Sequence, residues 1–184
     1  MKVVSTEIPD VKIVEPEVFG DSRGYFVEQY NRARFAEFGI DADFVQDNES
    51  CSSKGVFRGF HWQRAPFGQA KLVRVVRGAV IDIAVDVRAS SPTYGKYVSV
   101  MLSGENKCQL YIPRGFAHGF AVLEDDTIFS YKCDNFYVPE AECGINPSDE
   151  FLSGALPFAP SEFSMSAKDK VLPLFKDITP YIEE

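Results

Sequence analysis

Short apolar stretches separated by turn residues follow one another along most of this chain of 184 residues. Gly, Pro, Asn and Asp divide the stretches, and apolar and polar positions alternate within several of them, which is typical of β-strands. We predict nine strands, in residues 24–30, 42–48, 55–63, 71–78, 79–87, 96–102, 108–113, 119–124 and 127–133. Their number and spacing favour an all-β sandwich or barrel.

Helical patterns are few. Residues 31–39 (NRARFAEFG) predict one helix, with Asn31 as its N-cap and Gly39 at its end. A second short helix is expected in residues 164–170 near the C-terminus, capped by Ser164 or Ser166.

The strand pattern weakens after Val138, and residues 146–163 predict a long loop laid over the barrel. No repeat, low-complexity run or linker precedes the last quarter of the chain. Residues 1–184 are therefore predicted to form a single domain.

The period-two alternation predicts which side chains share a face of a strand. In residues 79–87 one face is apolar enough for a core, and the other carries the two carboxylates of Asp82 and Asp86. In residues 71–78 Lys71 falls on the same face as Val73 and Val75. Lys71 is either an edge residue in water or part of a ligand cavity, because lysine is seldom buried without a partner.

Composition and charge limit the possible functions. With 45% hydrophobic and 14% aromatic residues, the chain can bury one sizeable core. Its net charge of −8 argues against nucleic acid as a partner, since binding to the phosphate backbone needs a broad cationic face. A small anionic ligand remains compatible with this charge.

Neither a signal peptide nor a membrane segment is predicted, because no apolar run is long enough. We expect a cytoplasmic protein without a membrane partner. Its four cysteines show no CxxC spacing and are expected to be reduced thiols: Cys51, Cys108, Cys133 and Cys143.

The chain has only two histidines, His61 and His118. The sequence PRGFAHGF around His118 resembles the second metal motif of the cupin barrels, but the H-x-H of the first motif is missing. Catalytic metal sites usually take three or more protein ligands, so two histidines cannot form the usual three-histidine site. We predict no metal ion.

His61 lies in the stretch RGFHWQ, where it is either a packing residue or a catalytic base. Strict alternation places it on the face of Gly59 and Gln63, opposite Phe60, Trp62 and Arg58. The glycine leaves open space beside the imidazole, which suits a substrate.

Six stretches in order resemble the dTDP-4-dehydrorhamnose 3,5-epimerases. They are VFGDSRGYFVEQYN, FVQDNES, GVFRGFHWQ, KLVRVVRGAVIDIAVDVR, SSPTYGKYVSVMLSGENKCQLYIPRGFAHGFAVL and YKCDNFYVPEAECGI, and the resemblance resumes at SAKDK. It implies a cupin-type β jelly roll with a few short helices, a homodimer, and epimerisation beside a ketone without any cofactor. The substrate implied is a dTDP-linked 4-keto-6-deoxy sugar, inverted at C3 and C5 on the way to dTDP-L-rhamnose.

The resemblance also implies the catalytic residues. His61 matches the family base and Asp169 the carboxylate that orients it, while Tyr131 matches the proton donor on the opposite face of the sugar. Lys71 matches the cation beside the C4 oxygen, where it would stabilise an enolate. Further matches are expected to bind substrate, some from the dimer partner: Arg23, Phe26, Glu28, Gln46, Asn48, Arg58, Asp82 and His118.

Three departures from the family pattern concern the approach to Lys71 (FGQAK), Arg114 where a Glu is common, and GINPSDEF in place of a tryptophan-bearing stretch. The last two put the sugar specificity in question, and we expect them near the cavity mouth or the covering loop. Three alternatives stay open at this point: an epimerase acting at C3 or C5 alone, a non-catalytic sugar-nucleotide-binding cupin, and a metal-dependent cupin oxygenase.

Overall fold

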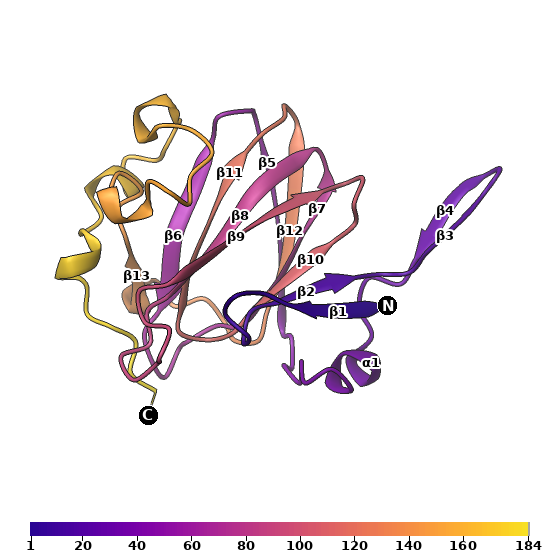
Figure 1. The fold of residues 1–184 in the computed structure, drawn as a ribbon, viewed down its shortest axis with the longest axis horizontal. Helices are drawn as coiled ribbons and strands as arrows, with labels where there is room; N and C mark the ends of the chain where they lie inside the picture. Colours follow the sequence, from indigo (N-terminus) through magenta and orange to yellow (C-terminus); the bar gives the residue numbers. More distant parts are fainter. Residues whose placement is uncertain (184) are drawn as a thin grey trace.

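Two antiparallel sheets face each other and form a sandwich (Figure 1). The structure is a computed structural model, and it describes residues 1–183. The six-stranded sheet has the order β1-β2-β10-β7-β12-β5, and the five-stranded sheet has the order β13-β6-β11-β8-β9. A separate hairpin, β3-β4, projects from the body of the molecule (Figure 1). The predicted all-β class is confirmed.

The strands of the six-stranded sheet are β1 (Lys2–Ser5), β2 (Lys12–Glu15), β10 (Gln109–Ile112), β7 (Lys71–Arg77), β12 (Thr127–Cys133) and β5 (Gln46–Ser52). Those of the five-stranded sheet are β13 (Glu142–Gly144), β6 (Phe57–Gln63), β11 (Phe116–Val122), β8 (Ala79–Asp86) and β9 (Tyr97–Ser103). The hairpin consists of β3 (Val18–Asp21) and β4 (Gly24–Val27). Each of the nine predicted strands overlaps an observed one. The strands β1, β2, β3 and β13 were not predicted, because three or four residues show too little alternation.

The one α-helix of residues 1–183, α1 (Arg32–Ala36), confirms the first helix prediction. The Asn31 side chain caps it by accepting a hydrogen bond from the Arg34 amide at 3.2 Å, and Gly39 follows with a φ of +69°. The second predicted helix is only a single 3-10 turn, η4 (Asp169–Val171), with Ser166 rather than Ser164 bound to the Asp169 amide. The other 3-10 turns are η1 (Pro139–Ala141), η2 (Glu150–Leu152), η3 (Pro160–Glu162) and η5 (Phe175–Asp177). No helix of residues 1–183 is long and apolar enough to cross a membrane.

Apolar side chains form three buried clusters, and two of them adjoin the five-stranded sheet. The first lies between the sheets and includes Val73, Val75, Val80, Ala84, Phe120 and Phe129. The second lies outside the five-stranded sheet, beneath the C-terminal segment, and includes Phe60, Trp62, Ile83, Val85, Leu152 and Phe163. The prediction that residues 146–163 cover the barrel is confirmed by this second cluster.

Strand β8 differs from the prediction of one apolar and one polar face. Asp82 and Asp86 are both fully buried, because they share the face of Val80 and Ala84, which lies against the sandwich interior. Each buried carboxylate has partners, as burial of a charge requires.

Strand β6 departs from strict alternation at Gly59. In its pairing with β11, His61 lies opposite His118, but Arg58 lies opposite Phe120, so the register shifts between them. Gly59 has a φ of +126°, and a Cβ there would lie 2.4 Å from the Gly119 Cα. The bulge places Arg58 and His61 on one face, so the prediction that they lie on opposite faces is wrong.

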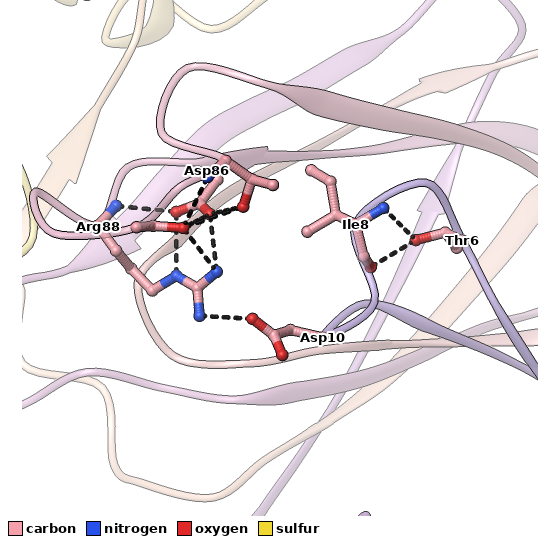
Figure 2. A network of polar contacts seen from close by, with 7 residues as sticks. Thr6, Ile8, Asp10, Asp86 and Arg88 are labelled. Atoms are coloured by element: carbon pink, nitrogen blue, oxygen red, sulfur yellow. Dashed lines mark hydrogen bonds and ion pairs between the residues drawn. The ribbon is translucent and has the colours of Figure 1, made fainter.

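A polar network surrounds Asp86 and Arg88 at the end of β8 (Figure 2). The Asp86 carboxylate accepts hydrogen bonds from the Arg88 guanidinium, at 2.7 and 3.0 Å, and from the hydroxyls of Ser91 and Thr93, at 2.6 Å each. Arg88 also pairs with Asp10 at 2.9 Å, beside a loop in which Thr6 Oγ1 donates to the Ile8 carbonyl (Figure 2). The network therefore joins the N-terminal loop to the end of β8.

Candidate active site

Two adjoining cavities open on the sandwich interior, one of about 720 Å³ and one of about 290 Å³. Four residues line both of them: Asn48, His61, Lys71 and Tyr131. Three of the four predicted catalytic residues therefore meet at the junction of the cavities. Asp169, the fourth, lines the larger one.

These residues come from opposite sheets. His61 belongs to β6 of the five-stranded sheet, whereas Lys71 opens β7 and Tyr131 lies on β12 of the six-stranded sheet. Tyr131 pairs with Val73 in register, two positions along β7 from Lys71, so the ammonium and the phenol share a wall. A molecule in the cavity has the imidazole on one side and these two groups on the other.

His61 is held by Asp169. The Nε2 atom of His61 lies 2.8 Å from Oδ1 of Asp169, a residue that is almost fully buried. Burial raises the pKa of Asp169, but the hydrogen bond and charge of His61 outweigh it and hold that pKa below its usual range. An ionised carboxylate can only accept, so Nε2 carries the proton that it donates and Nδ1 is left free.

The other ring nitrogen faces Glu142, a residue that the sequence did not single out. Nδ1 of His61 lies 3.7 Å from Oε1 of Glu142. The Glu142 carboxylate also accepts hydrogen bonds from the Tyr137 hydroxyl, at 2.6 Å, and from the Lys168 ammonium. Burial raises the pKa of Glu142, but these two donors outweigh it and lower that pKa. Glu142 belongs to the three-residue strand β13, whose pairing with β6 leaves no signal in the sequence.

Lys71 and Tyr131 are both affected by burial. Burial lowers the pKa of Lys71, against the opposing influence of Cys133, Asp82 and Glu142. Burial raises the pKa of Tyr131, so its phenol keeps its proton further into the alkaline range. The cavity therefore contains a lysine with a lowered pKa and a tyrosine with a raised pKa.

His118 and Asp82 form a buried pair beneath the same cavity. Nε2 of His118 lies 2.9 Å from the Asp82 carboxylate, and His118 lines the larger cavity, whereas Asp82 lines neither. Burial lowers the pKa of His118, although Asp82 opposes that shift. Within residues 1–183, no three His, Cys, Asp or Glu side chains gather closely enough to hold a metal ion.

Three of the predicted nucleotide-binding residues line the cavities. Gln46 faces the smaller one, Arg58 the larger one and Asn48 both. Gln46 Nε2 donates to Asn48 Oδ1 at 3.1 Å, and Arg58 Nε donates to Ser52 Oγ at 3.1 Å. Polar groups that can bind an anion and a base thus surround the catalytic junction.

Arg23, Phe26 and Glu28 lie elsewhere in the chain, on the hairpin and just after it. All three are exposed, and none lines the cavities beside His61. Arg23 pairs with Asp21 at 2.5 Å, and Glu28 pairs with Arg34 at 2.8 Å. Within one chain, the structure does not bring these residues to the site.

Two of the three departures, Arg114 and residues 146–163, lie outside both cavities, whereas Gln69 of the FGQAK stretch lines the smaller one. Arg114 Nε donates to Asp134 Oδ2 at 2.9 Å, and Asp134 Oδ1 accepts from the Ala70 amide at 2.6 Å, next to Lys71. Residues 146–163 pack over the outer face of the five-stranded sheet and line neither cavity. The expected place in the covering loop is confirmed for residues 146–163, whereas Arg114 belongs neither to that loop nor to the cavity lining.

Known proteins resemble this chain over almost its full length. A family model described as dTDP-4-dehydrorhamnose 3,5-epimerase matches residues 5–177. The enzyme of that name from Escherichia coli strain K12 is 51% identical over 173 residues, covering 94% of this chain and 93% of its own. The one from Shigella flexneri is 57% identical over 154 residues, 83% of this chain and 85% of its own.

A solved structure of a similarly named enzyme also matches this chain. The dTDP-6-deoxy-D-glucose-3,5-epimerase RmlC from Legionella pneumophila, in complex with dTDP-4-keto-L-rhamnose, is 44% identical. It superposes with a TM-score of 0.93, covering 100% of this chain and 98% of its own.

Proposed function

This chain belongs to the dTDP-4-dehydrorhamnose 3,5-epimerase family, and from that premise we propose how its residues carry out the reaction. The chain is an isomerase of dTDP-L-rhamnose biosynthesis, which inverts C3 and C5 of dTDP-4-dehydro-6-deoxy-D-glucose. Both carbons lie next to the C4 ketone, so each loses its proton to a base if the resulting enolate is stabilised.

His61 is the base of this proposal. Nδ1 takes the proton from the sugar carbon while the C–H electron pair enters the enolate and places negative charge on the C4 oxygen. Asp169 holds the Nε2 proton at 2.8 Å, which fixes the tautomer and stabilises the imidazolium that forms.

Lys71 and Tyr131 complete the reaction from the other sheet. The Lys71 ammonium stabilises the charge on the C4 oxygen. The Tyr131 hydroxyl then delivers its proton to the carbon from the face opposite His61, so the centre is inverted. The tyrosinate and the imidazolium return to their starting states by exchange with solvent. The placement of base and acid on facing sheets is the observation that supports these roles most strongly.

Arg58, Gln46 and Asn48 are proposed to bind the dTDP group, because a guanidinium suits a diphosphate and the amides suit a pyrimidine. Asp82 supports the site through His118, whose ring it holds at 2.9 Å beneath the cavity. No cofactor takes part in this scheme, and a location in the cytoplasm stays a prediction from the sequence.

Product NMR in D₂O tests the role of His61. The wild type is expected to introduce deuterium at C3 and C5 of the dTDP-sugar. His61→Ala is expected to lower turnover and deuterium uptake by at least about 100-fold, since general base catalysis contributes this much. Binding of dTDP serves as the control for folding. Uptake at the wild-type rate in His61→Ala would show that another group is the base.

We also propose that the chain forms a homodimer in which the hairpin of each subunit enters the partner's cavity. The hairpin exposes Val18, Phe19, Tyr25 and Phe26, with between 44% and 67% of each residue accessible. An apolar surface of this kind is typical of an interface. Such an exchange would bring Arg23, Phe26 and Glu28 to the dTDP group.

A mixing experiment tests the exchange. His61→Ala and Arg23→Ala are each expected to be poorly active as homodimers. If Arg23 acts on the partner's site, subunit exchange between equal amounts yields heterodimers with one intact site each, and about a quarter of wild-type activity returns. If no activity returns although mass spectrometry detects heterodimers, Arg23 does not act across the interface.

A further inference from the structure

The segment that carries Asp169 lies along the short edge strand β13. Every second residue of β13 and its extension contacts it. Glu142 pairs with Lys168, and the Asn146 side chain donates to the Lys170 carbonyl at 3.1 Å. Between them, Gly144 lies so close to Leu172 that an added Cβ would come within 2.7 Å of its side chain. Residues 168–172 therefore dock along one face of β13 and its extension.

The position of Asp169 depends on this docking. Asp169 is the first residue of the turn η4, and within that turn its amide donates to Ser166 Oγ at 3.1 Å. Lys168 directly precedes it, so the ion pair with Glu142 fixes the backbone one residue away from the carboxylate that orients His61.

Glu142 is itself well anchored. Its side chain is only 13% exposed and accepts from the Tyr137 hydroxyl at 2.6 Å. Glu142 pairs with Gln63, which lies two residues along β6 from His61. Its distance of 3.7 Å from His61 Nδ1 exceeds that of a hydrogen bond, so its firm polar contacts are with Tyr137 and Lys168.

We propose that Glu142 is a positioning residue, which acts through Lys168 to hold Asp169 in place on His61. The Glu142–Lys168 pair forms a clasp between β13 and η4, and its effect on the reaction passes through the Asp169–His61 hydrogen bond. This inference rests on the proposed role of His61 as the base. It predicts that breaking the clasp slows the chemical step without weakening the binding of substrate.

A double-mutant cycle tests the clasp. Lys168→Met removes the ammonium but keeps most of the stem, and it is expected to lower kcat about tenfold with KM changed by less than about twofold. In the Asp169→Asn background the same substitution is expected to have no further effect, because its route to His61 is already lost. Lys170→Met is the matched control and is expected to keep wild-type kinetics, since Lys170 is exposed and lines neither cavity.

The imidazole provides a second readout. In ¹⁵N-edited NMR of the ligand-free protein, the Nε2–H proton of His61 is expected downfield in the wild type and in Lys170→Met. It is expected to broaden or move upfield in Lys168→Met and in Glu142→Gln. A structural change without effect on Asp169 would leave this signal in place.

Two results would overturn the inference. Lys168→Met could lower kcat equally in the wild-type and Asp169→Asn backgrounds, or could raise KM. Either result would mean that Lys168 acts on the substrate directly. An unchanged Nε2–H signal in Lys168→Met would mean that the clasp does not place Asp169. Activity retained by His61→Ala would instead contradict the proposed function, so the two failures are distinguishable.

Discussion

At the scale of single residues, the two nitrogens of His61 have different neighbours. Asp169 accepts the Nε2 proton at 2.8 Å, while Nδ1 lies 3.7 Å from the carboxylate of Glu142, a residue that lines the smaller cavity. The imidazole is therefore oriented from one side and free to react on the other. This division is what a general base requires.

Lys71 sets the alkaline limit of activity in this account. Burial lowers the pKa of Lys71 and raises that of Tyr131, so burial makes the ammonium easier to deprotonate and the phenol harder. We predict that the alkaline decrease in kcat has an apparent pKa below 10.5, the ordinary value for lysine, because the charge beside the C4 oxygen then disappears. In Lys71→Arg the cation persists, so kcat should be roughly 10 to 100 times lower but its alkaline fall should move to higher pH. A pH profile of kcat with the same alkaline limb in both proteins would assign that limb to another group.

The individual residues were predictable to different degrees. His61, Lys71, Tyr131 and Asp169 follow from the family resemblance, and the structure brings them together. Glu142 was missed, because its contact with His61 depends on the pairing of β13 with β6.

At the scale of elements, the bulge in β6 determines which side chains reach the cavity. Gly59 breaks the alternation, so Arg58 and His61 share a face while Phe60 and Trp62 pack beneath the C-terminal segment. The sequence showed a glycine beside the histidine but not the shift in register, since a bulge depends on the partner strand.

Two glycines with the same backbone conformation allow a matched test of this bulge. Gly59 and Gly24 have φ values of +126° and +127°, but only at Gly59 would a Cβ collide with backbone, 2.4 Å from the Gly119 Cα. We predict that Gly59→Ala lowers the free energy of unfolding by roughly 2 kcal/mol more than Gly24→Ala, because overpacking adds to the strain of a positive φ. Denaturant unfolding of both variants measures the difference. Equal decreases in the free energy of unfolding would mean that β6 can shift away from β11 without destabilising the fold.

The C-terminal elements were harder to predict than the strands. In place of a helix over residues 164–170 the chain has the 3-10 turn η4 at Asp169–Val171, where the segment docks on β13. Local sequence carries little information about such a turn.

At the scale of the whole molecule, the cupin-type jelly roll implied by the family resemblance is confirmed. The two sheets place base and acid on facing walls, and the C-terminal segment covers the outer face of one sheet while delivering Asp169 to its inner face. The alternation in β8 predicted a polar face for Asp82 and Asp86, but both carboxylates are buried, Asp82 against His118 and Asp86 against Arg88.

The network around Asp86 makes the stability of the molecule depend on pH. Burial raises the pKa of Asp86, but hydrogen bonds from Arg88, Ser91 and Thr93 outweigh it and hold the pKa below 3.8. Because the folded state keeps this carboxylate ionised, its contribution is complete at neutral pH and is lost as the pH falls through the lowered pKa.

We predict that Asp86→Asn lowers the free energy of unfolding by roughly 3–5 kcal/mol at neutral pH, since Arg88 loses its buried partner. The exposed partner offers a control: Asp10→Asn should cost less than about 1 kcal/mol. Urea unfolding between neutral and acid pH should show the gap between Asp86→Asn and wild type narrowing as the pH falls. A gap that stays constant would mean that Asp86 is not ionised in the folded protein.

The central claim is that the proton leaves toward His61 on one sheet and returns from Tyr131 on the other. The most direct measurement is proton NMR of the dTDP-sugar in D₂O with Tyr131→Phe, which records deuterium uptake and inversion at C3 and C5 separately. The account predicts that uptake continues, because His61 still removes the proton, while inversion falls at least about 100-fold. Uptake and inversion that fall together, or that both match the wild type, would contradict it.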